Sequence, residues 1–162
     1  MRTIVIAGAH RSLGKTTLGR KLKAQLGGRV ELVKVGHGRE KGKEELLLHS
    51  TEAAVRLIAD RRHQASLDYL IIESNTILRS FTPDFCIFIE GGRSQQGGQA
   101  AKEPSKKSTQ YARECADLII SQDSDLSRLG ELLSSSRVFE DSDISALCSL
   151  IESFCKARRD YL

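Results

Sequence analysis

The sequence predicts an α/β fold in which helices cover both faces of a mostly parallel central sheet. Short runs rich in β-branched and apolar residues alternate with segments whose apolar residues recur at helical spacing; the runs are 3–7, 29–35, 67–73 and 84–90. The last run is apolar between its two acidic ends, which is typical of a strand buried on both faces of a parallel sheet. The 162 residues show neither an internal repeat nor a linker, so we expect a single domain spanning 1–162.

The first strand leads into a glycine-containing loop and then a helix. Residues 8–17 read Gly-Ala-His-Arg-Ser-Leu-Gly-Lys-Thr-Thr, and residues 18–26 have helical spacing. A strand, a loop ending in Gly-Lys-Thr and a helix together form the P-loop, or Walker A motif, whose backbone N–H groups and helix dipole bind phosphate. In that motif Lys15 reaches the β- and γ-phosphates and Thr16 ligates Mg²⁺. Ala9 takes the place of the motif's usual first glycine, one residue after Gly8.

The motif therefore predicts a P-loop NTPase that binds Mg²⁺ together with GTP or ATP. The predicted nucleotide-binding residues are Gly8, Ala9, His10, Arg11, Ser12, Leu13, Gly14, Lys15, Thr16 and Thr17.

The second strand, 29–35, alternates polar and apolar residues and follows the helix stop at Gly27-Gly28. The loop after it, 36–43, leaves the same sheet edge as the P-loop, because the carboxyl ends of parallel strands share one edge. Its His37 and Arg39 either face phosphate or an acidic substrate, or belong to a solvated basic turn. The sequence favours neither alternative.

Residues 44–64 are expected to form a helix with a break near 49–51, where Ser50 or Thr51 is a suitable N-cap.

The third strand, 67–73, is an apolar run closed by the carboxylate of Glu73, as in a Walker B strand. Asp68 is a poor competitor, because it sits roughly 16 Å away at about 3.3 Å per residue. We expect Glu73 to hold Mg²⁺ directly or through water, or to orient the attacking water. Lys15 and Glu73 are thus the predicted catalytic residues, and Thr16 and Glu73 the predicted metal ligands. Asn75 follows on the same edge as a candidate substrate contact.

The rest of the chain continues the alternation of helices and strands. After the fourth strand, the glycine-rich segment 91–104 is expected to be either a lid or substrate loop carrying Arg93 and Lys102, or a disordered surface loop. The other expected elements are a short helix or turn at 75–81, a helix at 106–116, a strand at 117–121, a helix at 125–134, an edge strand at 137–139, and a final helix capped by Asp141 or Ser142.

Composition excludes several classes of protein. The net charge of +4, from 25 basic and 21 acidic residues, is too mild to indicate a nucleic-acid partner. The chain lacks tryptophan, and its few Phe and Tyr residues do not alternate with basic ones, so a base-stacking platform is not expected. No apolar run approaches the about 18 residues of a membrane span, and residue 1 leads straight into a strand, so we expect a cytoplasmic protein. The widely spaced Cys86, Cys115, Cys148 and Cys155 are expected to be buried thiols.

Residues 3–75 resemble the nucleotide-binding protein B family of molybdopterin-guanine dinucleotide biosynthesis. The P-loop residues 14–17 and the strand-end Glu73 match that family, and Lys34 and His37 roughly match its lysine–histidine segment; Ser74 stands in place of its usual glycine. The resemblance implies GTP binding and an accessory role in molybdenum-cofactor maturation. It also implies a cofactor-biosynthesis protein as partner, and leaves a homodimer open.

Two other functions remain as alternatives. A small-molecule kinase would use the same P-loop, with Glu73 or His37 near the acceptor and Arg93 or Lys102 clamping the transferred phosphoryl group. A non-hydrolysing module would bind nucleotide only.

Overall fold

The structure is a computed structural model that describes residues 1–9, 13–36, 46–64, 66–90, 107–120 and 141–160. Within these residues, every strand pairing is parallel and the strands form one six-stranded sheet in the order β3-β2-β4-β1-β5-β6. The strands are β1 (Arg2–Gly8), β2 (Val30–Val35), β3 (Leu46–Leu48), β4 (Tyr69–Glu73), β5 (Phe85–Ile89) and β6 (Leu118–Ile120). The predicted α/β fold with a parallel sheet is confirmed.

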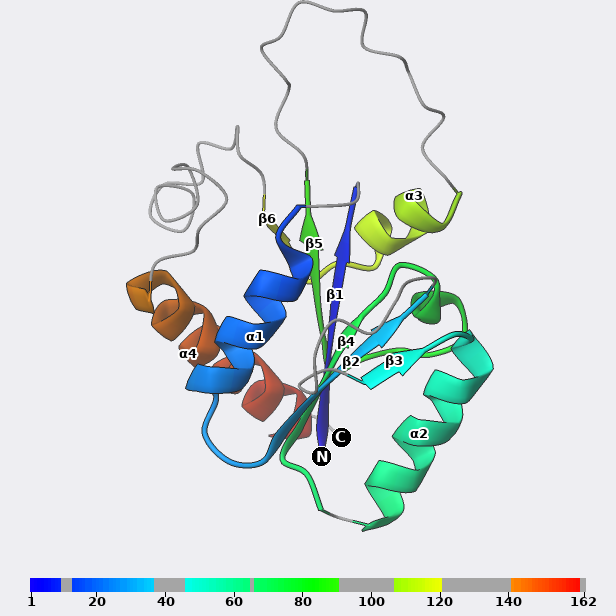
Figure 1. The fold of residues 1–162 in the computed structure, drawn as a ribbon. Coiled ribbons are helices and arrows are strands. Elements are labelled where there is room, and N and C mark those ends of the chain that lie inside the picture. The colour runs from blue at the N-terminus through cyan, green and yellow to red at the C-terminus, as the bar shows by residue number, and fades with distance from the viewer. Residues whose placement is uncertain (10–12, 37–45, 65, 91–106, 121–140, 161–162) are drawn as a thin grey trace, which may run out of the picture.

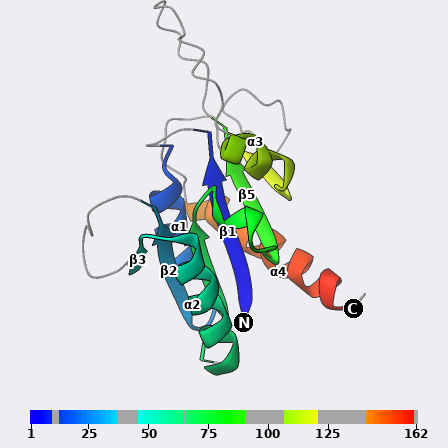
Figure 2. The same cartoon turned by 90° about the vertical axis from the view of Figure 1, so that its right-hand side faces the viewer.

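Helices cover both faces of the sheet, with α1 and α4 on one face and α2 and α3 on the other (Figures 1 and 2). Their bounds are α1 (Lys15–Gln25), α2 (Thr51–Gln64), α3 (Lys107–Glu114) and α4 (Asp141–Asp160), with a short 3₁₀ helix η1 (Ile77–Arg79) after β4. Side chains of a strand point to alternate faces, so β1 supplies both layers. Ile4 and Ile6 pack with α1 and α4, whereas Val5 packs in the layer that contains η1, α2 and α3.

The expected helix at 44–64 is wrong in its first part. Residues 46–48 form the edge strand β3, which pairs with the outer side of β2 in the register Val33↔Leu46. Leucine favours helices locally, but the unpaired backbone groups along β2 give this short run a partner, and tertiary context overrides propensity. The helix α2 begins at Thr51, and Ser50 caps it as expected, because its Oγ accepts a hydrogen bond of 3.1 Å from the Ala53 N–H.

The remaining expectations divide between confirmed elements and segments outside the described residues. The expected strands at 84–90 and 117–121 and the helix at 106–116 correspond to β5, β6 and α3. The expected helix at 125–134 and edge strand at 137–139 lie outside the described residues, as do almost all of the loops 36–43 and 91–104.

The four cysteines do not all share the expected burial. Cys86, Cys148 and Cys155 are buried as expected, but Cys115 is exposed in the turn just after α3. The side of α3 that faces the sheet is marked by the buried Ala112, whereas Arg113 and Glu114 at its carboxyl end and Cys115 just after it are all exposed.

None of the helices within the described ranges combines the length and the apolar content needed to cross a bilayer.

The topology creates a switch point at the centre of the sheet. The neighbours β1 and β4 are followed by connections on opposite faces, since α1 packs on one face and η1 on the other. Open α/β sheets bind ligands in the crevice at the carboxyl ends of the strands at such a point. The ends of β1 and β4, at Gly8 and Glu73, are therefore where a ligand site is expected.

Candidate functional site

The end of β1 is held by the side chain of Asn75, which stands two residues after the end of β4. The Gly8 N–H donates a hydrogen bond of 2.9 Å to Asn75 Oδ1, and Asn75 Nδ2 donates one of 2.9 Å to the Gly8 carbonyl. A Cβ at Gly8 would lie 3.2 Å from both the Ile89 carbonyl oxygen and the Lys15 Cδ. A larger residue at position 8 would therefore be crowded, because the side chain of Lys15 and the Ile89 carbonyl both lie close to the end of the strand.

The helix α1 begins with a positive end that no acidic side chain of its own neutralises. Gly14 is the N-cap with φ 78°, a left-handed conformation that favours glycine, and its carbonyl accepts the Leu18 N–H at 2.8 Å. The first turn of α1 contains no acidic residue. The N-terminal amides and the helix dipole thus favour an anion at this position.

Three polar side chains from three elements meet beside this helix start. The Thr16 hydroxyl of α1 donates a 2.5 Å hydrogen bond to Glu73 Oε2 at the end of β4. Lys34 of β2 places its Nζ 3.3 Å from Glu73 Oε1 and 3.4 Å from Thr16 Oγ1. The Glu73 side chain is only 10% exposed, so Thr16 and Lys34, rather than water, compensate its negative charge.

Lys15 lies within the electrostatic reach of the same cluster. Burial lowers the pKa of its ammonium below the ordinary value, the Glu73 carboxylate acts to raise that pKa, and Lys34 acts to lower it. A partly desolvated ammonium gains from a phosphate oxygen that replaces the lost water. The site can therefore bind an anion beside a carboxylate and a hydroxyl.

The structure brings together Lys15, Thr16 and Glu73, as the sequence predicted. Of the other predicted loop residues, Leu13 and Ala9 are half-buried and Thr17 is exposed. Asn75 lies at the predicted edge, but its amide is engaged with Gly8 and with Thr109 Oγ1 at 3.3 Å. Several predicted site residues lie outside the described part of the chain: His10, Arg11, Ser12, His37, Arg39, Arg93 and Lys102.

Lys34 was missed as a predicted site residue. Its register partner in the sheet is Glu73, so both side chains point to the face that α1 covers. A signal was present, since Lys34 stands one residue before the end of a strand whose carboxyl end must lie at the ligand edge. The sequence did not reveal that β2 is the direct neighbour of β4.

The donor chemistry of Thr16 and Glu73 suits a hard divalent cation. A hydroxyl and a carboxylate are oxygen ligands of the kind that Mg²⁺ takes, together with phosphate oxygens and water. Nowhere in the described residues do three or more His, Cys, Asp or Glu side chains gather as an all-protein metal site. A Mg²⁺ ion here would thus depend on oxygens from its ligand as well.

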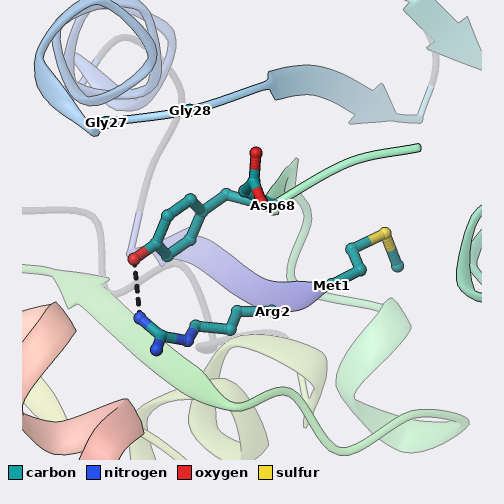
Figure 3. A pocket seen from close by; sticks show the side chains of 6 residues that line it. Met1, Arg2, Gly27, Gly28 and Asp68 are labelled. Carbon is teal, nitrogen blue, oxygen red and sulfur yellow. Dashed lines mark hydrogen bonds between the residues drawn. The ribbon is translucent and has the colours of Figure 1, made fainter. Parts of the chain in front are cut away.

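A separate cavity of about 360 Å³ lies at the opposite edge of the sheet. It is lined by residues at the amino ends of β1 and β4 and after α1, and Arg2 Nη1 donates a 2.7 Å hydrogen bond to the Tyr69 hydroxyl there (Figure 3). Because Tyr69 begins the strand that Glu73 ends, this cavity does not belong to the site at the switch point.

No protein-family model and no curated protein matches this chain.

Proposed function

We propose that this chain binds a Mg²⁺–nucleoside triphosphate, GTP or ATP, at the carboxyl edge of β1 and β4 and hydrolyses it slowly. The observation that carries the proposal is the contact of Thr16 Oγ1 with Glu73 Oε2, 2.5 Å apart, beside Lys15 and the start of α1. It joins the two residues that the Gly-Lys-Thr motif and the strand-end carboxylate single out.

Each residue has a defined task in this proposal. The amides at the start of α1 and the Lys15 ammonium bind the phosphates, and Gly14 lets the loop turn into the helix. Thr16 and Glu73 hold the metal, with Glu73 acting directly, through water, or on the attacking water. Mg²⁺, when bound, supplies positive charge that stabilises the charge on the phosphate oxygens.

The biological setting in this proposal rests on the resemblance of residues 3–75 to the molybdopterin-guanine dinucleotide family. The chain would act in the cytoplasm as an accessory protein of molybdenum-cofactor maturation, with a second cofactor-biosynthesis protein as partner.

The decisive test is a thermal melt of wild type and Lys15→Ala with MgCl₂ and ATP or GTP. A ligand at about 100 times its Kd stabilises a fold by about 2.7 kcal/mol, and each kcal/mol raises the Tm by roughly 2–4 °C at this size. We expect a rise of about 5–10 °C for wild type with one of the nucleotides. Lys15→Ala should keep its melt without ligand and lose at least about tenfold in affinity, because a charge-assisted contact is removed.

Lys156→Ala is the matched control, because it removes the same charge from an exposed position on α4. Wild type that melts at the same temperature with and without both nucleotides at millimolar concentration contradicts the proposal. The products then separate the alternatives. Nucleoside diphosphate and inorganic phosphate formed without an acceptor indicate hydrolysis. Nucleoside diphosphate formed only with an acceptor, which takes up the phosphoryl group, indicates a kinase, and binding without turnover indicates a binding module.

A further inference from the structure

Lys34 is the one side chain of the Thr16–Glu73–Lys34 cluster to which the proposed function gives no task. Its Nζ contacts Glu73 Oε1 at 3.3 Å and Thr16 Oγ1 at 3.4 Å, which are side chains of the two residues assigned to the metal. The contact is built into the sheet, because Lys34 and Glu73 are register partners on adjacent parallel strands. One ammonium thus already neutralises the carboxylate that a divalent cation would need.

We propose that Lys34 is a counter-cation of the Thr16–Glu73 pair, which a divalent metal ion must displace in order to bind there. The inference deepens the proposed function and rests on it for the biological role of the metal. Two positive centres within about 4 Å of one carboxylate repel each other strongly in a partly buried site. The Lys34 side chain is 38% exposed and has a flexible four-carbon stem, so its ammonium can turn toward solvent.

Such an arrangement couples metal binding to phosphate binding. Without a metal, the ammonium keeps the buried Glu73 carboxylate paired, which avoids the high cost of an uncompensated buried charge. A triphosphate offers the displaced ammonium a new anionic partner next to Lys15. Metal therefore binds weakly to the protein alone and more tightly when phosphate is present.

The test uses Mn²⁺ alone as the probe, without any nucleotide, and measures the concentration of unbound Mn²⁺ by electron paramagnetic resonance. The proteins are wild type, Lys34→Met, Lys34→Gln, Lys34→Arg, Glu73→Gln, and Lys156→Met as the charge-matched control on α4. Because the Lys34 side chain is 38% exposed, water screens its ion pair with Glu73 and limits the contribution of the pair to up to about 1 kcal/mol, so Lys34→Met should lower the half-saturating Mn²⁺ concentration by roughly threefold to fivefold. Lys34→Arg and Lys156→Met should match wild type, and Glu73→Gln should lose this binding.

Equal or weaker Mn²⁺ binding by the neutral Lys34 variants overturns the inference, and so does the lack of Mn²⁺ binding by every variant. Lys34→Gln serves as a second neutral variant in case Lys34→Met does not fold, which circular dichroism checks. Failure of the proposed function would show separately, as wild type that binds neither ATP nor GTP, while the Mn²⁺ titrations of the same proteins still decide the role of Lys34.

Discussion

At the scale of single residues, Glu73 ends the strand β4, and the four residues before it in the strand are all buried and apolar or aromatic. A carboxylate that is almost fully buried is costly unless it is paired, and here the Thr16 hydroxyl and the Lys34 ammonium pair it. Glu73 is therefore the one charged side chain of β4, and it lies at the carboxyl end of the strand, where a ligand is expected.

Glu73→Gln keeps the size of the side chain and an oxygen that accepts the Thr16 hydrogen bond, but it removes the charge. We expect kcat for hydrolysis to fall by about 10²- to 10⁴-fold, the range typical of a lost acid–base or metal-orienting group. Nucleotide Kd should change by less than about fivefold, because the phosphates are bound mainly by Lys15 and the start of α1. Steady-state kinetics and equilibrium titration at saturating Mg²⁺ provide the comparison.

Glu90→Gln is the matched control for Glu73. Glu90 also follows a strand at the carboxyl edge, but it pairs with Arg113 of α3, with Nε and Oε1 2.5 Å apart. The Glu90→Gln variant should hydrolyse nucleotide with the same kcat as wild type. A Glu73→Gln protein as fast as wild type would show that another group activates the water.

Asn75 ties the ends of β1 and β4 together through both backbone polar groups of Gly8. Asn75→Ala leaves the Gly8 N–H and C=O without these partners, which should cost about 1–3 kcal/mol of unfolding free energy. The Tm should fall by roughly 2–4 °C per kcal/mol. Asn75→Asp can accept from the Gly8 N–H but cannot donate to its carbonyl, so it should also melt below wild type. If Asn75→Ala has the same Tm as wild type, the two hydrogen bonds add nothing to stability.

At the scale of elements, the comparison of α2 and β3 shows what local sequence does and does not determine. The start of α2 was predictable, because Ser50 is a suitable N-cap and its hydroxyl does accept the Ala53 N–H. The strand β3 was not predictable, because three leucines are too short a run to show a period, and only the open edge of β2 makes them a strand.

Ser50→Ala should destabilise α2 by about 1 kcal/mol, the usual cost of losing an N-cap side chain. We expect the Tm to fall by roughly 2–4 °C, whereas Ser50→Asp, which keeps an acceptor and adds a negative charge at the helix start, should retain the wild-type Tm. Calorimetric melts of the three proteins measure this. An Asp variant as unstable as the Ala variant would argue against capping as the cause.

At the scale of the whole molecule, the limit of the sequence analysis is strand order. Lys15, Thr16 and Glu73 were predictable because each belongs to a local pattern, a loop before a helix or a carboxylate closing an apolar strand. Lys34 had only weaker signals, a rough match to the lysine–histidine segment of the resembled family and a place near the end of a predicted strand, and neither indicated a contact with Glu73. The place of Lys34 in the site depends on β2 being the neighbour of β4, and that adjacency is set by packing across the whole sheet.

The reactivity of the buried cysteines reports on how often the packed layers on the two faces of this sheet open. Cys86 lies in the layer with α2 and α3, Cys148 and Cys155 lie in the layer with α1 and α4, and Cys115 is exposed. Burial raises the pKa of Cys86 to about 12 and that of Cys148 to about 11, which suppresses the reactive thiolate in the folded protein. A disulfide reagent should therefore react rapidly with Cys115 and slowly with the other three.

The slow reaction requires opening of the fold, so a ligand that stabilises the fold should slow it. With Mg²⁺–nucleotide at about 100 times its Kd, the open population and the slow rate should fall by up to about 100-fold. Mass spectrometry after a pulse of reagent distinguishes the cysteines, and Cys115→Ser removes the fast phase as a control. The site joins β1, β2, β4 and α1, and a small domain usually opens as one cooperative unit. Cys86 in β5 and Cys148 in α4 should therefore be protected to the same extent. Protection of Cys86 without Cys148 would show instead that α4 opens independently of the sheet and of the nucleotide.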